Sequence, residues 1–117
     1  MDQDYSAYLP HVNVKDGKAR VINNLKLYKT LLGKFNGREL ANDVIAAINA
    51  KDSTNVVHSA HALKGTSANL GFPEVCKITD EIENLGKGGN DASHLIEPLN
   101  ASVNALMETI EKFLDAK

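Results

Sequence analysis

The sequence predicts a single all-α domain: an antiparallel four-helix bundle with an additional short N-terminal helix. The chain has 117 residues, the usual size of one domain, and 43% of them are hydrophobic. Aromatic residues make up only 5% and Trp is absent, so the core must be built from aliphatic side chains, which suits packed helices. Apolar residues recur at helical spacing, without strand-like alternation or internal repeats. We expect a lead-in at residues 1–13 and one helical-bundle domain at residues 14–117.

The N-terminal half is divided by breaks between apolar helical segments. Leu9-Pro10 ends the lead-in, and residues 14–22 are typical of a short helix. Apolar side chains then recur at helical spacing from Leu25 to about Ala50, and a bend could fall at Asn36-Gly37. This stretch therefore forms either one long helix or two shorter ones.

The next helix is predicted over residues 53–70. Asp52-Ser53-Thr54 offers capping side chains at its start, and Gly71 and Pro73 should end the helix after Leu70. At about 100° per residue, one stripe of this helix collects the side chains that should face the core. The members of this stripe are Val56, Ala60, Leu63, Ser67 and Leu70.

Two further helices complete the predicted bundle. Pro73 fits the first turn of a helix that ends at the glycines of residues 86–89. The acidic run at residues 80–83 of this helix is most simply a solvated face. The last helix begins near Asp91 or Ser93, and it tolerates Pro98 only near its start or at a kink.

Charge and cysteine content exclude several classes of function. The net charge is −2, with 13 basic and 15 acidic residues spread along the chain, so no field of one sign attracts nucleic acid or an anionic membrane. Cys76, the single cysteine, can form no internal disulfide, and no apolar run approaches the roughly 18 residues of a spanning helix. The acidic start does not resemble a secretory signal. We therefore expect a cytoplasmic protein. Because no large apolar patch can be read from the pattern, we also expect a monomer.

His61 is the candidate functional residue. The helical wheel places it roughly 140° from the buried stripe, so its imidazole should be exposed beside Lys64 and Gly65. Glycine in a helix interior costs about 0.5 to 1 kcal/mol relative to alanine, and its missing Cβ lets another molecule approach closely. A lysine can offset charge on phosphoryl oxygens, and an exposed neutral imidazole is a competent nucleophile for phosphorus. Together the three residues predict a phosphoryl acceptor.

The run from Ala60 to Gly71, AHALKGTSANLG, resembles the H-x-x-K-G signature, with a glycine six residues on, of histidine phosphotransfer domains. The similarity covers roughly residues 12–115, with one departure at Ile22-Asn23-Asn24, where relatives often have a glycine pair. The resemblance implies that His61 carries the phosphoryl group, Lys64 stabilises it and Gly65 leaves room for a partner.

The resemblance also implies the partner, the receiver domain of a response regulator, whose aspartate and bound Mg²⁺ supply the rest of the chemistry. The chain should then need no metal or cofactor of its own and, without a nucleotide-binding motif, should be a phosphocarrier and not an enzyme. From the wheel, the docking surface should include Val57, Ala68 and Phe72 beside His61. Two alternatives stay open: a phosphocarrier of a two-component phosphorelay, and a receiver-binding adaptor that docks without efficient phosphorylation. The chain could be free-standing or a module of a hybrid sensor histidine kinase.

Other polar residues have simpler interpretations. His58 lies one turn before His61, but two histidines at this spacing without a nearby carboxylate or cysteine make a poor metal site. Asp91 and His94 have a ligand-like spacing but lie in a predicted cap region. Cys76 neighbours an apolar face, so we expect a packed structural cysteine.

Overall fold

The computed structural model describes residues 8, 9, 11–20 and 24–115. Within these residues the elements are, in order, α1 (Val14–Arg20), α2 (Leu25–Gly33), α3 (Gly37–Asn49), α4 (Ser53–Leu70), α5 (Pro73–Lys87), the 3-10 turn η2 (Ser93–Leu95) and α6 (Ile96–Asp115). No strand occurs in this part of the chain. The prediction of an all-α fold is therefore confirmed.

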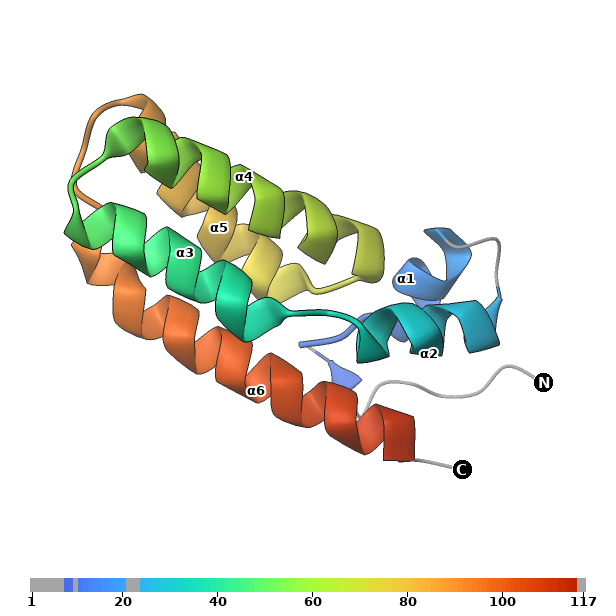
Figure 1. Ribbon diagram of the computed structural model, residues 1–117. Helices are drawn as coiled ribbons and strands as arrows, with labels where there is room; N and C mark the ends of the chain where they lie inside the picture. Colours follow the sequence, from blue (N-terminus) through green and yellow to red (C-terminus); the bar gives the residue numbers. More distant parts are fainter. Residues whose placement is uncertain (1–7, 10, 21–23, 116–117) are drawn as a thin grey trace.

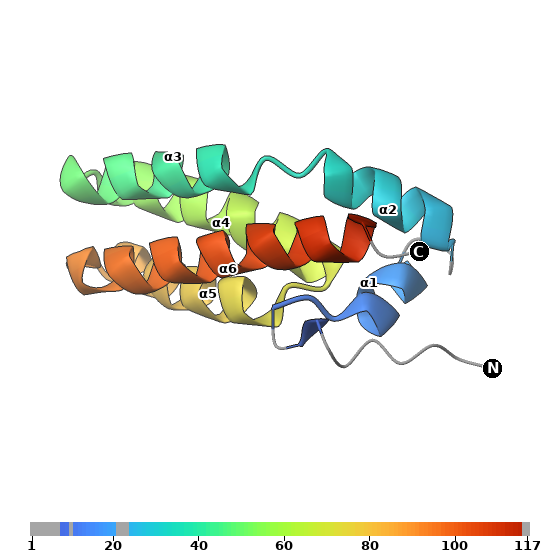
Figure 2. The same cartoon turned by 90° about the horizontal axis from the view of Figure 1, so that it is seen from below.

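Helices α3, α4, α5 and α6 form the bundle. Short connections make each of them antiparallel to the next, and the four lie side by side (Figures 1 and 2). Helix α4 packs most extensively against α5 and next against α3. The short helices α1 and α2 lie at the end of the bundle where α4 finishes (Figure 1). None of the described helices is both long and apolar enough to cross a membrane.

The stretch from Leu25 to Ala50 forms two helices because the chain turns inward between them. Helix α2 ends at Gly33, and α3 begins at Gly37. Between them Phe35 is buried, and its ring packs against that of Phe72 with centroids 4.9 Å apart. The Phe35 ring occupies the space that a Cβ of residue 37 would need, so the glycine permits this turn.

Helix α4 has the predicted bounds because local signals set both of its ends. The Asp52 side chain accepts a hydrogen bond from the backbone N–H of Asn55 at 3.2 Å, and Gly71 ends the helix with a φ of 80°. Glycine has no Cβ and therefore adopts this left-handed conformation readily. The whole predicted stripe from Val56 to Leu70 is buried. The face that carries His61 is therefore turned away from the core.

The C-terminal end of α4 is anchored by the N-terminal segment. The buried hydroxyl of Tyr28 donates to the carbonyl of Leu70 at 2.6 Å, and the backbone N–H of Asn13 donates to the carbonyl of Gly71 at 2.6 Å. Burial, helped by the charge of Asp16, raises the pKa of Tyr28, so the phenol remains a donor. Val12, in the predicted lead-in, is also buried. These contacts fix the orientation of the helix that carries His61.

Candidate functional site

His61 lies on the outer face of α4 and its side chain is 71% exposed. The predicted exposure is therefore confirmed. Helix α5 packs along α4, and the imidazole contacts a residue of α5. Its Nδ1 atom lies 3.0 Å from Oε1 of Glu83, a residue 22 positions further along the chain.

Glu83 is the centre of a charged cluster between α4 and α5. Its Oε1 also lies 3.1 Å from Nζ of Lys64, and its Oε2 lies 2.9 Å from Nζ of Lys87. The side chain is only 3% exposed. The prediction that the acidic run at residues 80–83 is a solvated face is therefore wrong for Glu83. The helical phase of α5 turns this carboxylate toward α4, while Asp80 and Glu81 remain exposed.

The cations around Glu83 keep its carboxylate ionised. Hydrogen bonds from Lys87, then Lys64 and His61, lower the pKa of Glu83 to about 2, although burial acts in the opposite direction. An ionised carboxylate has no proton to donate and can only accept hydrogen bonds. The ring nitrogen that faces it, Nδ1 of His61, must therefore be the protonated one.

This assignment determines which nitrogen of His61 can react. In a neutral imidazole only one nitrogen carries a proton, and the other keeps a free lone pair. With Nδ1–H donated to Glu83, the lone pair is on Nε2, in a side chain that is mostly exposed. When the imidazole is neutral, the buried carboxylate therefore sets its tautomer and leaves Nε2 as the nucleophilic nitrogen.

Lys64 lies beside the imidazole, but its ammonium group already has partners. Nζ contacts Oε1 of Glu83 and, at 3.3 Å, Oδ1 of Asp80. The hydrogen bond to Glu83 is the largest of the effects that raise the pKa of Lys64, so the side chain stays charged. Because Lys64 and His61 share one carboxylate oxygen, a negative charge added to the imidazole would compete with Glu83 and Asp80 for this lysine.

Gly65 leaves open space at the surface. Apart from the neighbouring backbone of α4, no atom of the described residues lies within 4 Å of the position that a Cβ would take there, so packing among these residues does not require the glycine. Val57 and Ala68, two of the predicted docking residues, are half-buried on the same helix.

Phe72, the third predicted docking residue, lies in the core. It is 1% exposed and packs against Phe35, so the prediction that it lines the docking surface is wrong. The left-handed turn at Gly71 directs the following side chain inward, where Phe72 precedes the first turn of α5. The remaining predicted members of the surface are Val57 and Ala68.

The other candidate residues form no second chemical site. Asp91 accepts hydrogen bonds from the backbone N–H and the hydroxyl of Ser93, at 3.1 and 2.6 Å, and so lies just before the 3-10 turn η2, in the region where a helix start was expected. His58 is exposed and Cys76 is half-buried. In the part of the chain that the structure describes, no three His, Cys, Asp or Glu residues are grouped as metal ligands.

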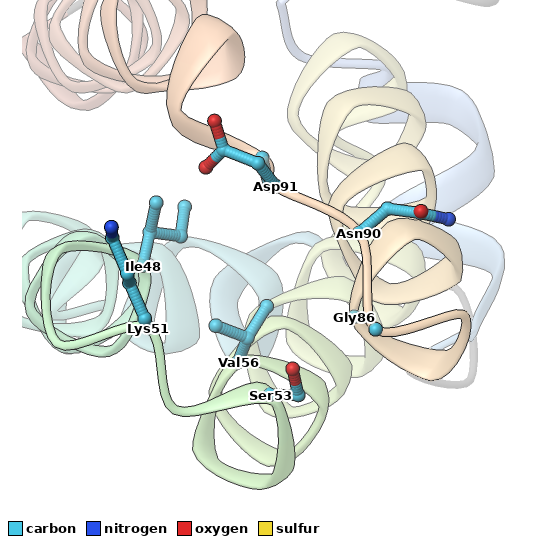
Figure 3. A pocket seen from close by; sticks show the side chains of 9 residues that line it. Ile48, Lys51, Ser53, Val56, Gly86, Asn90 and Asp91 are labelled. Atoms are coloured by element: carbon cyan, nitrogen blue, oxygen red, sulfur yellow. The ribbon is translucent and has the colours of Figure 1, made fainter.

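A pocket lies at the N-terminal end of α4. It is enclosed by the α3–α4 turn and by the connection that follows α5, and it is lined in part by Ile48, Lys51, Val56 and Asp91 (Figure 3). No histidine or cysteine lines it. The surface around His61 therefore remains the candidate site.

The cluster predicts how stability depends on pH. Because folding lowers the pKa of Glu83 from its ordinary 4.5 to about 2, the carboxylate stabilises the fold fully above pH 4.5. This contribution is lost as the pH falls toward 2. Urea denaturation across this interval should show a decline in the free energy of unfolding that is smaller in Glu83→Gln. Glu81→Gln, at an exposed position of the same helix, should retain the decline; equal declines in all three proteins would contradict the role of Glu83.

The bundle and the exposed imidazole with its buried carboxylate are the features of a helical phosphocarrier domain. The sequence model of the Hpt domain family matches residues 35–115, and the chain belongs to this family. The match begins at Phe35, whereas the similarity was expected from about residue 12. No curated protein matches the sequence.

A solved structure supports the fold over a longer stretch. The crystal structure of histidine-containing phosphotransfer protein B (HptB) from Pseudomonas aeruginosa PAO1 is similar, with a TM-score of 0.81 and 24% sequence identity. The likeness covers 91% of this chain and 96% of that chain. At this level of identity, the likeness shows that the two proteins share the fold.

Proposed function

We propose that this chain accepts a phosphoryl group on Nε2 of His61 and exchanges it with the aspartates of response-regulator receiver domains in a two-component phosphorelay. The observation that carries this proposal is the 3.0 Å hydrogen bond between Nδ1 of His61 and the buried carboxylate of Glu83. It leaves the lone pair on the exposed nitrogen, and membership of the Hpt domain family supports phosphoryl transfer as its use.

The transfer requires no proton to leave the histidine. The Nε2 lone pair attacks phosphorus, the N–P bond forms, and the bond between phosphorus and the aspartate oxygen of the receiver breaks. The aspartate carboxylate leaves with the electron pair, and the imidazole keeps its Nδ1 proton and becomes positively charged. Glu83, 3.0 Å from Nδ1, offsets that charge. The reverse steps return the phosphoryl group to a receiver.

Lys64 and Gly65 have separate roles in this proposal. In the resting protein the ammonium group of Lys64 contacts the carboxylates of Asp80 and Glu83 on α5. When the negatively charged phosphoryl group reaches His61, this ammonium group turns to bind the phosphoryl oxygens. Gly65 leaves the space into which the receiver's active-site edge enters. The Mg²⁺ that neutralises the transferring group belongs to the receiver, so this chain contributes position and charge.

The docking surface that we propose surrounds His61 on α4. Val57 and Ala68 flank the imidazole with small apolar side chains, which are half-buried and can exclude water from the junction. The partner is a receiver domain, either separate or part of a hybrid sensor histidine kinase.

Transfer from a phosphorylated receiver tests this function. The purified chain is mixed with the receiver and Mg²⁺, and acid-labile phosphate on the chain is followed with time. We expect the label to move to the chain, and we expect no label when the chain is incubated with ATP and Mg²⁺ alone. Stable binding of several phosphorylated receivers without any transfer would contradict the carrier function and would favour an adaptor that only docks.

Gly65→Ala should separate stability from transfer. Outside the backbone of its own helix, the new methyl group meets no atom of the described residues within 4 Å. Alanine in a helix interior is favoured over glycine by about 0.5 to 1 kcal/mol, so the free energy of unfolding should rise by that amount. The same methyl group holds the receiver away, and the transfer rate should fall by about 10- to 100-fold. Urea denaturation and transfer kinetics measure the two effects. A more stable variant that transfers at the wild-type rate would show that this space is not used.

A further inference from the structure

Two lysines bind opposite oxygens of the Glu83 carboxylate. Lys64, from α4, shares Oε1 with the imidazole of His61, at 3.1 and 3.0 Å respectively. Lys87, the last residue of α5, contacts Oε2 at 2.9 Å. One carboxylate thus has two cationic partners, only one of which is beside the imidazole.

Phosphorylation of His61 would change the surroundings of Lys64 more than those of Lys87. A dianionic phosphoryl group on Nε2 competes for the ammonium on the His61 side of the carboxylate. Asp80 tolerates the departure of Lys64 because its side chain is 53% exposed and water replaces the contact. Glu83, which is 3% exposed, has little access to water, so after Lys64 departs its charge is balanced by the phosphorylated imidazole on Oε1 and by Lys87 on Oε2.

We propose that Lys87 is a positioning residue for the phosphoryl exchange: it holds Oε2 of Glu83 so that Oε1 keeps the imidazole of His61 oriented while Lys64 moves to the phosphoryl group. The inference rests on the proposed function of His61. Lys87 acts only through Glu83, on the carboxylate oxygen opposite the one that His61 and Lys64 share.

The charged groups around Glu83 show why Lys87 is the lysine that can hold the carboxylate while Lys64 moves. From α4, the groups that contact the carboxylate are His61 and Lys64, and from α5 the contacting group is Lys87. Asp80, the remaining charged member of the cluster, is an anion bound to Lys64. Once Lys64 has moved, Lys87 is the only lysine of this cluster that still binds the carboxylate.

Lys87→Met tests the proposal with two readouts. The first is the rate of phosphoryl transfer from a phosphorylated receiver, which should fall about tenfold, the effect of raising the barrier by about 1.4 kcal/mol. The second is the ¹⁵N NMR spectrum of the His61 ring in the unphosphorylated chain, which reports the tautomer directly. It should change from mainly Nδ1–H in the wild type to a mixture of both tautomers, and Lys87→Arg should restore both readouts.

Lys77→Met is the matched control. Lys77 is exposed on the same helix and has no ion-pair partner among the residues that the structure describes. This variant should leave the transfer rate and the spectrum unchanged. A Lys87→Met protein with a lower free energy of unfolding but wild-type transfer and tautomer would overturn the proposal, because Lys87 would then be only structural. If the wild type accepts no phosphoryl group, the proposed function fails, and an unchanged ring spectrum in Lys87→Met overturns the positioning role independently.

Discussion

His61→Gln is expected to abolish phosphorylation of the chain while the bundle stays folded. The proposed nucleophile is Nε2, and the glutamine amide provides no ring nitrogen, so transfer should fall by at least about 10³-fold. The amide of glutamine can still donate a hydrogen bond to Glu83, which preserves the charged cluster. Because the His61 side chain is 71% exposed, the free energy of unfolding should change by no more than about 0.5 kcal/mol. Acid-labile labelling and urea denaturation give the two results.

His58→Gln is the control for this variant. His58 is exposed on the same helix, three positions before His61, and should be replaceable without loss of labelling. Labelling that survives in His61→Gln, or that disappears in His58→Gln, would assign the phosphoryl group to a residue other than His61.

Glu83→Gln should produce the second-largest decrease in the rate of phosphoryl transfer. Glutamine keeps the size of the side chain but can either donate or accept, so it no longer requires the proton on Nδ1 of His61. A wrong tautomer in a buried catalytic triad lowers the rate by about 10⁴-fold; the exposed imidazole can reorient here, and we expect about 10²-fold. The free energy of unfolding should also fall by about 1 to 3 kcal/mol, since Lys64 and Lys87 lose their shared anion. Transfer kinetics and urea denaturation at neutral pH measure these effects.

Glu81→Gln separates the effect of Glu83 from a general loss of negative charge on α5. Glu81 is exposed on the same helix, two positions away, and its replacement should leave transfer and stability nearly unchanged. Equal transfer rates in Glu83→Gln and Glu81→Gln would contradict the role assigned to the buried carboxylate.

Helix α4 shows what the sequence alone could predict. Its ends are set by the side chain of Asp52 and by the left-handed conformation of Gly71, which are local signals. Its buried stripe follows from helical geometry, and the exposure of His61 follows from the same wheel. The sequence therefore predicted the helix and the orientation of the histidine without knowledge of the neighbouring helices.

Glu83 could not be predicted in the same way, because its environment depends on how closely α4 and α5 pack. One signal was present in Gly86, which lies on the same side of α5 one turn later. A Cβ there would stand 3.0 Å from methyl groups of Val56 and Val57, so the glycine lets the two helices approach. With α4 this close, Glu83 is buried beside His61. The acidic run resembled a solvated face because the approaching helix is distant in sequence.

Phe72 illustrates the opposite error, in which a wheel was extended past the end of its helix. If the helix continued past Leu70, helical spacing from His61 would place residue 72 on the exposed face. The chain leaves helical geometry at Gly71, where φ is 80°, and Phe72 turns into the core against Phe35. A docking surface read from a wheel is therefore valid only between the caps of the helix.

The most direct test of the central claim is to locate the phosphoryl group on the chain and to follow its return to a receiver. The wild-type protein is labelled by a phosphorylated receiver with Mg²⁺, purified, cleaved into peptides and, in a parallel sample, mixed with unphosphorylated receiver. We expect an acid-labile, alkali-stable label in the peptide that contains His61, and loss of that label to the receiver aspartate. A label on any other peptide, or a label on His61 that no receiver can remove, would contradict the account of this chain as a phosphocarrier.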